Sequence, residues 1–216
     1  MALFLREIDG HTPRLPWTEG GLQRVVEAIE ALVELLTPAP FLAETFGQRH
    51  RQAFTGWQGM GAGLRRRAGT GDGVDPWVLR HLKELFALER RFGQAATGTT
   101  LLHSDLRADN IVVTKDRVFF VDWPGACIGA GWVDLVGFLP SVAMQGEPPP
   151  WKVFDPSPLT RGADESAVNS VLAALTRYFV GSALKPPPPG LSTLRPFQRA
   201  QGIGARAWLK HRLGGV

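Results

Sequence analysis

Several segments of the chain carry apolar residues at intervals of three and four, the spacing that puts them on one face of an amphipathic helix. Helix-start signals support two of these segments, because Asp75 precedes a proline at a first helical position and Asp164 stands as an N-cap. The predicted helices span residues 22–36, 77–92, 132–145, 165–180 and 194–213, with a less regular helix inside 41–58.

Glycine and proline interrupt the helical pattern between these segments. The glycines of residues 59–73 predict a loop or a loosely ordered crossing, and those of residues 125–131 predict a flexible turn. Residues 147–158 form a proline-rich connector. The four consecutive prolines within residues 185–190 exclude a helix or a central strand, so this segment is expected to be a spacer before the last helix.

A β-hairpin is predicted in the middle of the chain. Residues 111–113 and 118–121 are β-branched and aromatic runs on either side of a short polar turn. Pairing the last residue of the first run with the first residue of the second brings Asn110 beside Asp122 at the open end. Helices with one hairpin and one or two short strands predict a mainly α fold (α+β), unlike a doubly wound sheet with regularly alternating strands.

Polar side chains gather at the open end of this hairpin. A short strand over residues 101–102 leads into a loop that holds His103 and Asp105. The oxygens of Asn110 and Asp122 form the sparse ligand set that suits Mg²⁺, with phosphate and water completing the shell. Asp105 would orient a substrate hydroxyl and accept its proton during phosphoryl transfer. His103 is expected to play a structural part by bonding the backbone near Asp122.

The spacing His103-x-Asp105-x-x-x-x-Asn110, followed by a strand and Asp122, matches the catalytic loop and the metal-binding aspartate of kinases. Trp-Pro follows this aspartate in place of Phe-Gly. Together with HSDLRADNIVV before it and GAGWVDLVGF after it, the stretch resembles the aminoglycoside phosphotransferase and choline-kinase-like family. The resemblance is strongest over residues 101–139.

The resemblance implies an ATP-dependent phosphotransferase that moves the γ-phosphoryl group onto a hydroxyl of a small molecule, with ATP and Mg²⁺ as cofactors. It implies a protein-kinase-like C-terminal lobe over residues 11–216, preceded by a hinge-like segment over residues 1–10. Backbone groups of Arg6 and Ile8 would pair with the adenine edge in that hinge. Asp134 would brace the catalytic loop by accepting its hydrogen bonds, and simple charge complementarity at a helix N-terminus is the alternative.

A complete kinase of this group also has an N-terminal lobe with a phosphate loop and a strand lysine. Lys83 is the only lysine before the catalytic loop, and it lies in the middle of a predicted helix. Three explanations stay open: a fragment of an active enzyme, an inert product, or a missing N-terminal lobe that another chain supplies. We expect this chain alone to bind Mg-nucleotide weakly and to transfer phosphate slowly.

Two other classes of protein remain as alternatives. A catalytically silent kinase-like binding module would keep the fold without turnover. A metal-dependent hydrolase would use Asp105, Asp109 and Asp122, but it needs further ligands, and the sequence offers no H-x-x-x-H or Asp-x-Asp pair.

Amino-acid composition and charge indicate which classes of protein the sequence fits. The 216 residues are 44% hydrophobic and 20% charged, which is typical of a globular protein. The formal charge is +4, and the basic residues are spread out apart from residues 65–67 and 90–91, so they predict solvated surface and no nucleic-acid partner. The lone Cys127 builds neither a disulfide framework nor a zinc site.

The sequence gives no sign of membrane insertion or export. The opening residues turn charged after a few apolar positions, and no apolar run approaches ~20 residues, so a cytoplasmic protein without a membrane partner is expected. The substrate stays open among aminoglycosides, choline, sugars and other metabolites. The basic charge balance does not point to the acidic groove that cationic aminoglycosides usually meet.

Overall fold

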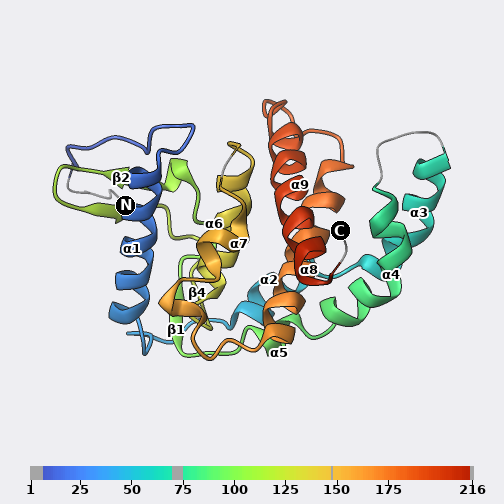
Figure 1. The fold of residues 1–216 in the computed structure, drawn as a ribbon, viewed down its shortest axis with the longest axis horizontal. Coiled ribbons are helices and arrows are strands. Elements are labelled where there is room, and N and C mark those ends of the chain that lie inside the picture. Colours follow the sequence, from blue (N-terminus) through green and yellow to red (C-terminus); the bar gives the residue numbers. More distant parts are fainter. Residues whose placement is uncertain (1–6, 70–74, 147, 215–216) are drawn as a thin grey trace.

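The computed structural model describes residues 7–69, 75–146 and 148–214, and over these residues it is mainly helical with two small two-stranded sheets (Figure 1). The prediction of a mainly α fold with a small β-hairpin is therefore confirmed. The helices are α1 (Glu19–Leu35), α2 (Phe46–Phe54), α3 (Trp57–Gly69), α4 (Pro76–Glu89), α5 (Phe92–Ala95), α6 (Val133–Ala143), α7 (Pro150–Phe154), α8 (Glu165–Ala183) and α9 (Leu194–Arg212). The strands are β1 (Thr100–Leu102), β2 (Ile111–Val113), β3 (Val118–Phe120) and β4 (Cys127–Gly129), and short 3₁₀ turns cover Ala108–Asn110 and Pro158–Thr160.

Side chains at the preceding residue cap the starts of three helices. The Thr18 side chain accepts a hydrogen bond from the first turn of α1, and the Asp75 carboxylate caps α4 ahead of its first-turn proline. At α2, Thr45 and Gln48 form a capping box in which each side chain satisfies the other's backbone N–H. These caps fix where three helices begin and therefore how they enter the core.

The centre of the molecule is α6, an apolar helix that is buried along most of its length. Phe138, Leu135 and Leu139 in this helix have no exposed surface. Figure 1 shows α1 and the β2–β3 hairpin at one end of the molecule and α3 and α4 at the other, with α6, α8 and α9 between them. Trp208 of α9 is fully buried and contacts Phe154 of α7 edge to face, at 5.1 Å between ring centroids.

The predicted hairpin register is confirmed. β2 and β3 pair antiparallel, with Val113 opposite Val118 and Ile111 opposite Phe120. A further backbone bridge adds residues before α1 to the hairpin, because His11 N donates to Val113 O at 3.0 Å and Val113 N donates to His11 O at 2.8 Å. The outer edge of β2 is thus hydrogen-bonded to the segment before α1, in addition to the pairing of β2 with β3.

Two loop predictions are wrong. Residues 59–69, predicted to be part of a loop over 59–73, belong to α3, and residues 70–74 lie outside the described part. Trp57 and Leu64 are each 1% exposed in this helix, so buried anchors outweigh the low helix propensity of its glycines. The turn predicted over 125–131 contains β4, which pairs antiparallel with β1 and buries Cys127.

Smaller differences concern helix ends and connectors. The helix predicted over 77–92 ends at Glu89, and the short helix α5 follows it. The proline-rich connector over 147–158 contains α7. Residues 185–190 form neither helix nor strand and join α8 to α9, as the prolines require.

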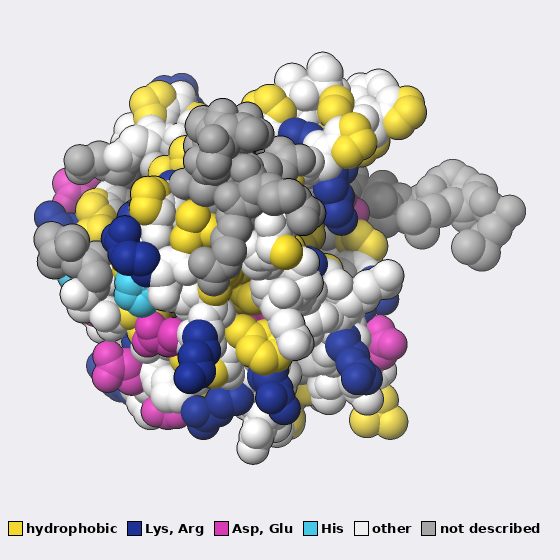
Figure 2. Space-filling view, turned by 90° about the vertical axis from the view of Figure 1, so that its right-hand side faces the viewer, with side chains coloured by type: hydrophobic (Ala, Val, Ile, Leu, Met, Phe, Trp, Pro, Cys, Tyr) yellow, Lys and Arg dark blue, Asp and Glu magenta, His cyan; other side chains and the backbone are white. Residues whose placement is uncertain are grey.

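The surface end formed by α3 and α4 carries dispersed charge. On the face shown in Figure 2, Lys and Arg side chains lie among acidic, apolar and uncharged ones and do not merge into one basic field. Within residues 7–69, 75–146 and 148–214, none of the helices combines the length and the apolar character that a membrane span requires.

Candidate active site

The polar loop between β1 and β2 is fixed at its start by a buried carboxylate. Asp134, in the first turn of α6, is 4% exposed and accepts the backbone N–H of His103 at 2.7 Å and of Ser104 at 2.8 Å. Burial raises the pKa of Asp134, and the two backbone donors act in the opposite direction. The structure thus brings Asp134 to the loop in the geometry that a brace needs.

His103 joins the loop to the far strand of the hairpin. Its Nε2 donates to Val121 O at 2.9 Å, and its Nδ1 accepts the N–H of Asp105 at 3.3 Å. The ring is fully buried and packs on Trp123 at 4.6 Å between centroids. Because both ring nitrogens are occupied, His103 holds two backbone segments together and is not free to act as a base.

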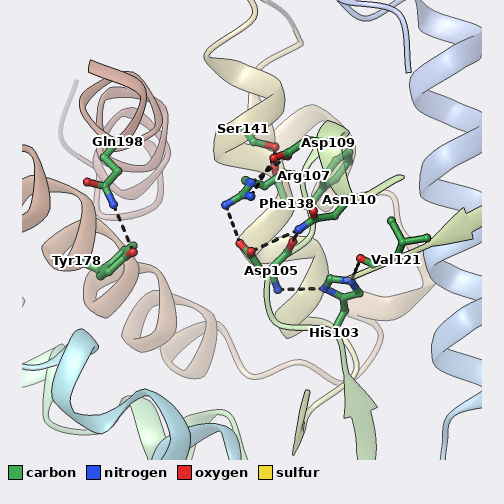
Figure 3. A network of polar contacts seen from close by, with 10 residues as sticks. All are labelled: His103, Asp105, Arg107, Asp109, Asn110, Val121, Phe138, Ser141, Tyr178 and Gln198. Atoms are coloured by element: carbon green, nitrogen blue, oxygen red, sulfur yellow. Dashed lines mark hydrogen bonds and ion pairs between the residues drawn. The ribbon is translucent and has the colours of Figure 1, made fainter. Parts of the chain in front are cut away.

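Asp105 and Asn110 meet directly, as Figure 3 shows. The Nδ2 of Asn110 donates to the backbone O of Asp105 at 2.8 Å and to its Oδ2 at 3.3 Å. Both partners are acceptors, so the amide nitrogen must face them and Oδ1 must point away. Among the described residues no hydrogen bond engages this Oδ1, which leaves it available to a cation.

The hairpin brings the backbone that directly precedes Asp122 to Asn110. Val121 N donates to Asn110 O at 3.0 Å, one residue before Asp122. The backbone of Asp122 has a φ of 65°, a left-handed conformation that aspartate tolerates better than most residues, and its side chain is exposed. An amide oxygen and an exposed carboxylate are donors that fit Mg²⁺.

The described residues contain no group of three or more His, Cys, Asp or Glu side chains arranged to hold a metal ion. A pair of protein oxygens therefore needs phosphate and water to complete a magnesium shell, as the sequence predicts. The same finding removes the ligand cluster that the alternative hydrolase requires. Asp109, one of the three acids proposed for the hydrolase, pairs with Arg107.

Arg107 connects two carboxylates of the loop (Figure 3). Its Nη1 lies 3.1 Å from Asp105 Oδ1, and its Nε and Nη2 donate to the two oxygens of Asp109 at 3.0 and 2.9 Å. Burial raises the pKa of Asp105, and the Arg107 charge counteracts this, whereas the hydrogen bonds from Arg107 lower the pKa of Asp109. Arg107 is thus a half-buried partner of the candidate base.

A cavity of 530 Å³ opens beside Asp105. The loop forms one wall, and helices α2, α6, α8 and α9 form the others. In Figure 3, Tyr178 of α8 and Gln198 of α9 lie across from Asp105, and Gln198 Nε2 donates to the Tyr178 hydroxyl at 3.4 Å. No signal in the sequence identifies these helical residues as part of the site, since their distance along the chain hides which face meets the loop.

His50 of α2 is another cavity residue that the sequence does not reveal. Its Nε2 lies 2.6 Å from Ser104 Oγ, and Ser104 has a φ of 71°. Burial, together with the neighbouring Arg49 charge, lowers the pKa of His50 from 6.5 to about 4. His50 is therefore a neutral hydrogen-bonding group at pH 7.

Of the two predicted hinge residues, the structure describes Ile8. Arg6 lies outside the described residues. Ile8 is half-buried and lies in an irregular segment three residues before the His11 bridge to β2. Pairing of their backbone with an adenine edge remains a prediction.

The braced loop, the hairpin and the cavity beside the candidate base are the features expected of a kinase-like phosphotransferase fold. The model of the Phosphotransferase enzyme family matches residues 2–154, and the chain belongs to this family. Neither the curated proteins nor the solved structures yield a match.

Proposed function

We propose that the chain transfers the γ-phosphoryl group of ATP to a hydroxyl of a small molecule. One observation carries this proposal: the Asp105 carboxylate contacts the candidate magnesium ligand Asn110 and also lines the 530 Å³ cavity. A hydroxyl in the cavity and a phosphate held near Asn110 would therefore meet at one carboxylate. Positioning of this kind supplies most of the catalysis in phosphoryl transfer.

Asp105 would orient the acceptor and take its proton. The acceptor oxygen forms a bond to the γ-phosphorus, the bond from that phosphorus to the bridging oxygen breaks, and ADP leaves with the electron pair. The hydroxyl proton passes to Asp105. Partial burial raises the pKa of this carboxyl and so makes it a better base, while the Arg107 charge opposes the rise.

Asn110 and Asp122 would hold Mg²⁺ against the nucleotide phosphates. The ion, when bound, neutralises charge on the transferring group, usually a larger effect than proton removal. His103 would hold Asp122 in place by bonding Val121, and Asp134 would hold Asp105 in place by bonding Ser104. Ile8, with Arg6, would contribute hinge backbone to the adenine.

The test uses the 216-residue chain with Mg-[γ-³²P]ATP and a panel of hydroxyl compounds. We expect Asp105→Asn to lower transfer by about 100-fold or more, the usual size of a general-base contribution. Asp122→Asn should raise the Mg²⁺ concentration needed for half-maximal rate. Asp116→Asn is the matched control, because Asp116 is an exposed aspartate in the hairpin turn.

Equal transfer by the chain and its Asp105→Asn variant would refute the role of Asp105. Binding of Mg-ATP in a calorimeter without any transfer would instead favour the silent binding module. We expect turnover below the ~1–100 s⁻¹ of ordinary kinases, because no lysine lines the cavity among the described residues. A rate within that range would contradict this last expectation alone.

A further inference from the structure

The cavity beside Asp105 is walled mainly by apolar and aromatic side chains. His50 stacks on Phe54 at 4.9 Å between centroids, and Phe54 contacts the Tyr178 ring at 5.6 Å. Leu175 of α8 and Phe197 of α9 continue this surface. Such walls favour a ligand with an apolar, ring-bearing body, because that body leaves water on binding.

The charged side chains at the cavity already have partners. Arg107 pairs with Asp105 and also with Asp109. The carboxylate of Asp134 is buried and accepts two backbone N–H groups. Arg49 pairs with Glu44 at 3.5 Å. Among the lining residues described, no carboxylate is left over to compensate a polycation, so its charges would lose water without gaining partners.

The side chain of Gln201 offers an amide to the cavity. Gln201 of α9 is 4% exposed and lines the cavity. No hydrogen bond engages its amide within the part of the chain that the structure describes. In the described chain, the fully buried side-chain atoms without a partner belong to Trp77, Arg177 and Trp208, so the Gln201 amide is reached from the cavity. It can therefore pair with an uncharged donor or acceptor of a ligand.

A helical glycine keeps the cavity open. Gly137 lies in the middle of α6, lines the cavity, and a Cβ added there would meet nothing within 4 Å. By contrast, a Cβ on Gly204 would lie 3.0 Å from Ala143 Cβ, so that glycine serves close helix packing. Glycine inside a helix is less favourable than alanine by about 1 kcal/mol. The space left by the missing side chain of Gly137 therefore belongs to the cavity.

We propose that the acceptor bound here is an uncharged alcohol or phenol with an apolar, ring-bearing body, and not a polycation. This inference rests on the proposed function for the word acceptor. The hydroxyl would face Asp105, the body would lie along Phe54 and Tyr178, and a polar substituent would pair with Gln201. The volume of 530 Å³ suits a drug-sized molecule.

Binding to the 216-residue chain tests this, with 2-(2-naphthyl)ethanol and the polycationic kanamycin as probes in ligand-observed NMR titrations. Gly137→Leu should fill the cavity and raise the Kd of the naphthyl alcohol by about tenfold or more, and Gly137→Ala should raise it less. Gly63→Leu is the control, because Gly63 lies inside α3, its added Cβ also meets nothing within 4 Å, and it does not line the cavity.

A second pair of variants covers the polar contact. Gln201→Leu should weaken binding of a naphthyl alcohol that carries an amide substituent by about five- to tenfold, and should leave the unsubstituted alcohol unchanged. Gln52→Leu on the exposed face of α2 is the matched control. Thermal unfolding of each variant verifies the fold, and Gly137→Leu is expected to unfold no more easily than the unaltered chain because it gains helix propensity.

The proposal is overturned if the naphthyl alcohol does not bind or if Gly137→Leu leaves its Kd unchanged. It is also overturned if kanamycin binds more tightly than the alcohol and Gly137→Leu weakens the binding of kanamycin. Transfer of ³²P to kanamycin and not to the alcohols would leave the phosphotransferase standing and overturn the ligand class. If the alcohol binds, the variants weaken its binding and no acceptor receives phosphate, the ligand class stands and the phosphotransferase proposal is overturned.

Discussion

Asp134→Asn is the substitution that tests the architecture of the site most directly. The wild-type carboxylate accepts the backbone N–H groups of His103 and Ser104 at 2.7 and 2.8 Å while only 4% exposed. Asparagine has nearly the same shape but offers one oxygen. Its NH₂ group must then face one of the two buried backbone donors.

The magnitude follows from these contacts. A hydrogen bond to a charged group contributes about 1.5–3 kcal/mol, and the asparagine loses one such bond and weakens the other. Burial raises the pKa of Asp134, so the ionised wild-type group is itself destabilised and the neutral amide recovers part of the loss. We expect Asp134→Asn to lower the free energy of unfolding by about 1–3 kcal/mol, and Asp134→Ala, which strands both donors, by about 3–5 kcal/mol.

Urea unfolding at pH 7 followed by tryptophan fluorescence measures these changes, and native-state hydrogen exchange at the amides of residues 103 and 104 shows whether the loss is local. Asp116→Asn, on the exposed hairpin turn, is the matched control and should stay within about 0.5 kcal/mol of the unaltered chain. If Asp134→Asn behaves like this control and both amides stay protected from exchange, the brace does not exist as described.

Three further predictions concern neighbouring groups. Arg107→Gln should raise the pKa of Asp105, measured by carboxyl ¹³C NMR titration, because the arginine charge now counteracts the rise due to burial; an unchanged titration would contradict the ion pair. The unfolded chain binds more protons than the folded one between the ordinary His50 pKa of 6.5 and its folded value of about 4, so stability falls as the pH falls through this window. Between pH 7 and 4, His50→Gln should reduce the fall in the free energy of unfolding by about 2–3 kcal/mol, allowing for the residual exposure of the ring. Equal slopes of this free energy against pH for the variant and the unaltered chain would refute the prediction. Thr45→Ala, which breaks the α2 capping box, should lower the free energy of unfolding by about 1 kcal/mol, with no change as the contrary result.

The hairpin was predictable from the sequence because local chemistry determines it. β-branched runs on both sides of a short polar turn leave few registers, and the register with Val113 opposite Val118 is the one observed. That register alone places Asn110 next to Val121, one residue before Asp122. The core of the candidate site therefore follows from residues less than 20 positions apart.

Helix α3 was not predictable in the same way. Its sequence is rich in glycine, and only the burial of Trp57 against the rest of the chain makes a helix favourable there. The Trp57 N–H donates to the carboxylate of Glu89 at 3.1 Å, and its indole N–H donates to Ala173 O at 3.1 Å. Both partners lie in other helices, so the stabilising contacts are tertiary and no local pattern contains them.

The cavity was equally out of reach of sequence reasoning. The hydrophobic pattern of α2, α8 and α9 shows that each helix buries a face, but not which part of that face stays open beside Asp105. Gly137 illustrates the difficulty, because a helix glycine carries meaning only when the direction of its missing Cβ is known.

Backbone strain in the described chain is concentrated at the two ends of the clamp that His103 forms. Ser104 and Asp122 are its non-glycine residues with positive φ, at 71° and 65°. One directly follows His103, and the other directly follows Val121, whose carbonyl accepts the His103 Nε2–H. Left-handed conformations of such residues cost about 1–3 kcal/mol each and persist only where surrounding contacts enforce them. Here the enforcing contacts come from His103 and from the Asp134 carboxylate, and the strain they hold in place orients the backbone of the candidate base and of the candidate metal ligand. The strained backbone at Asp122 does not improve packing, because this side chain is exposed. A role of the Asp122 carboxylate in ligand binding would explain why the strain is kept.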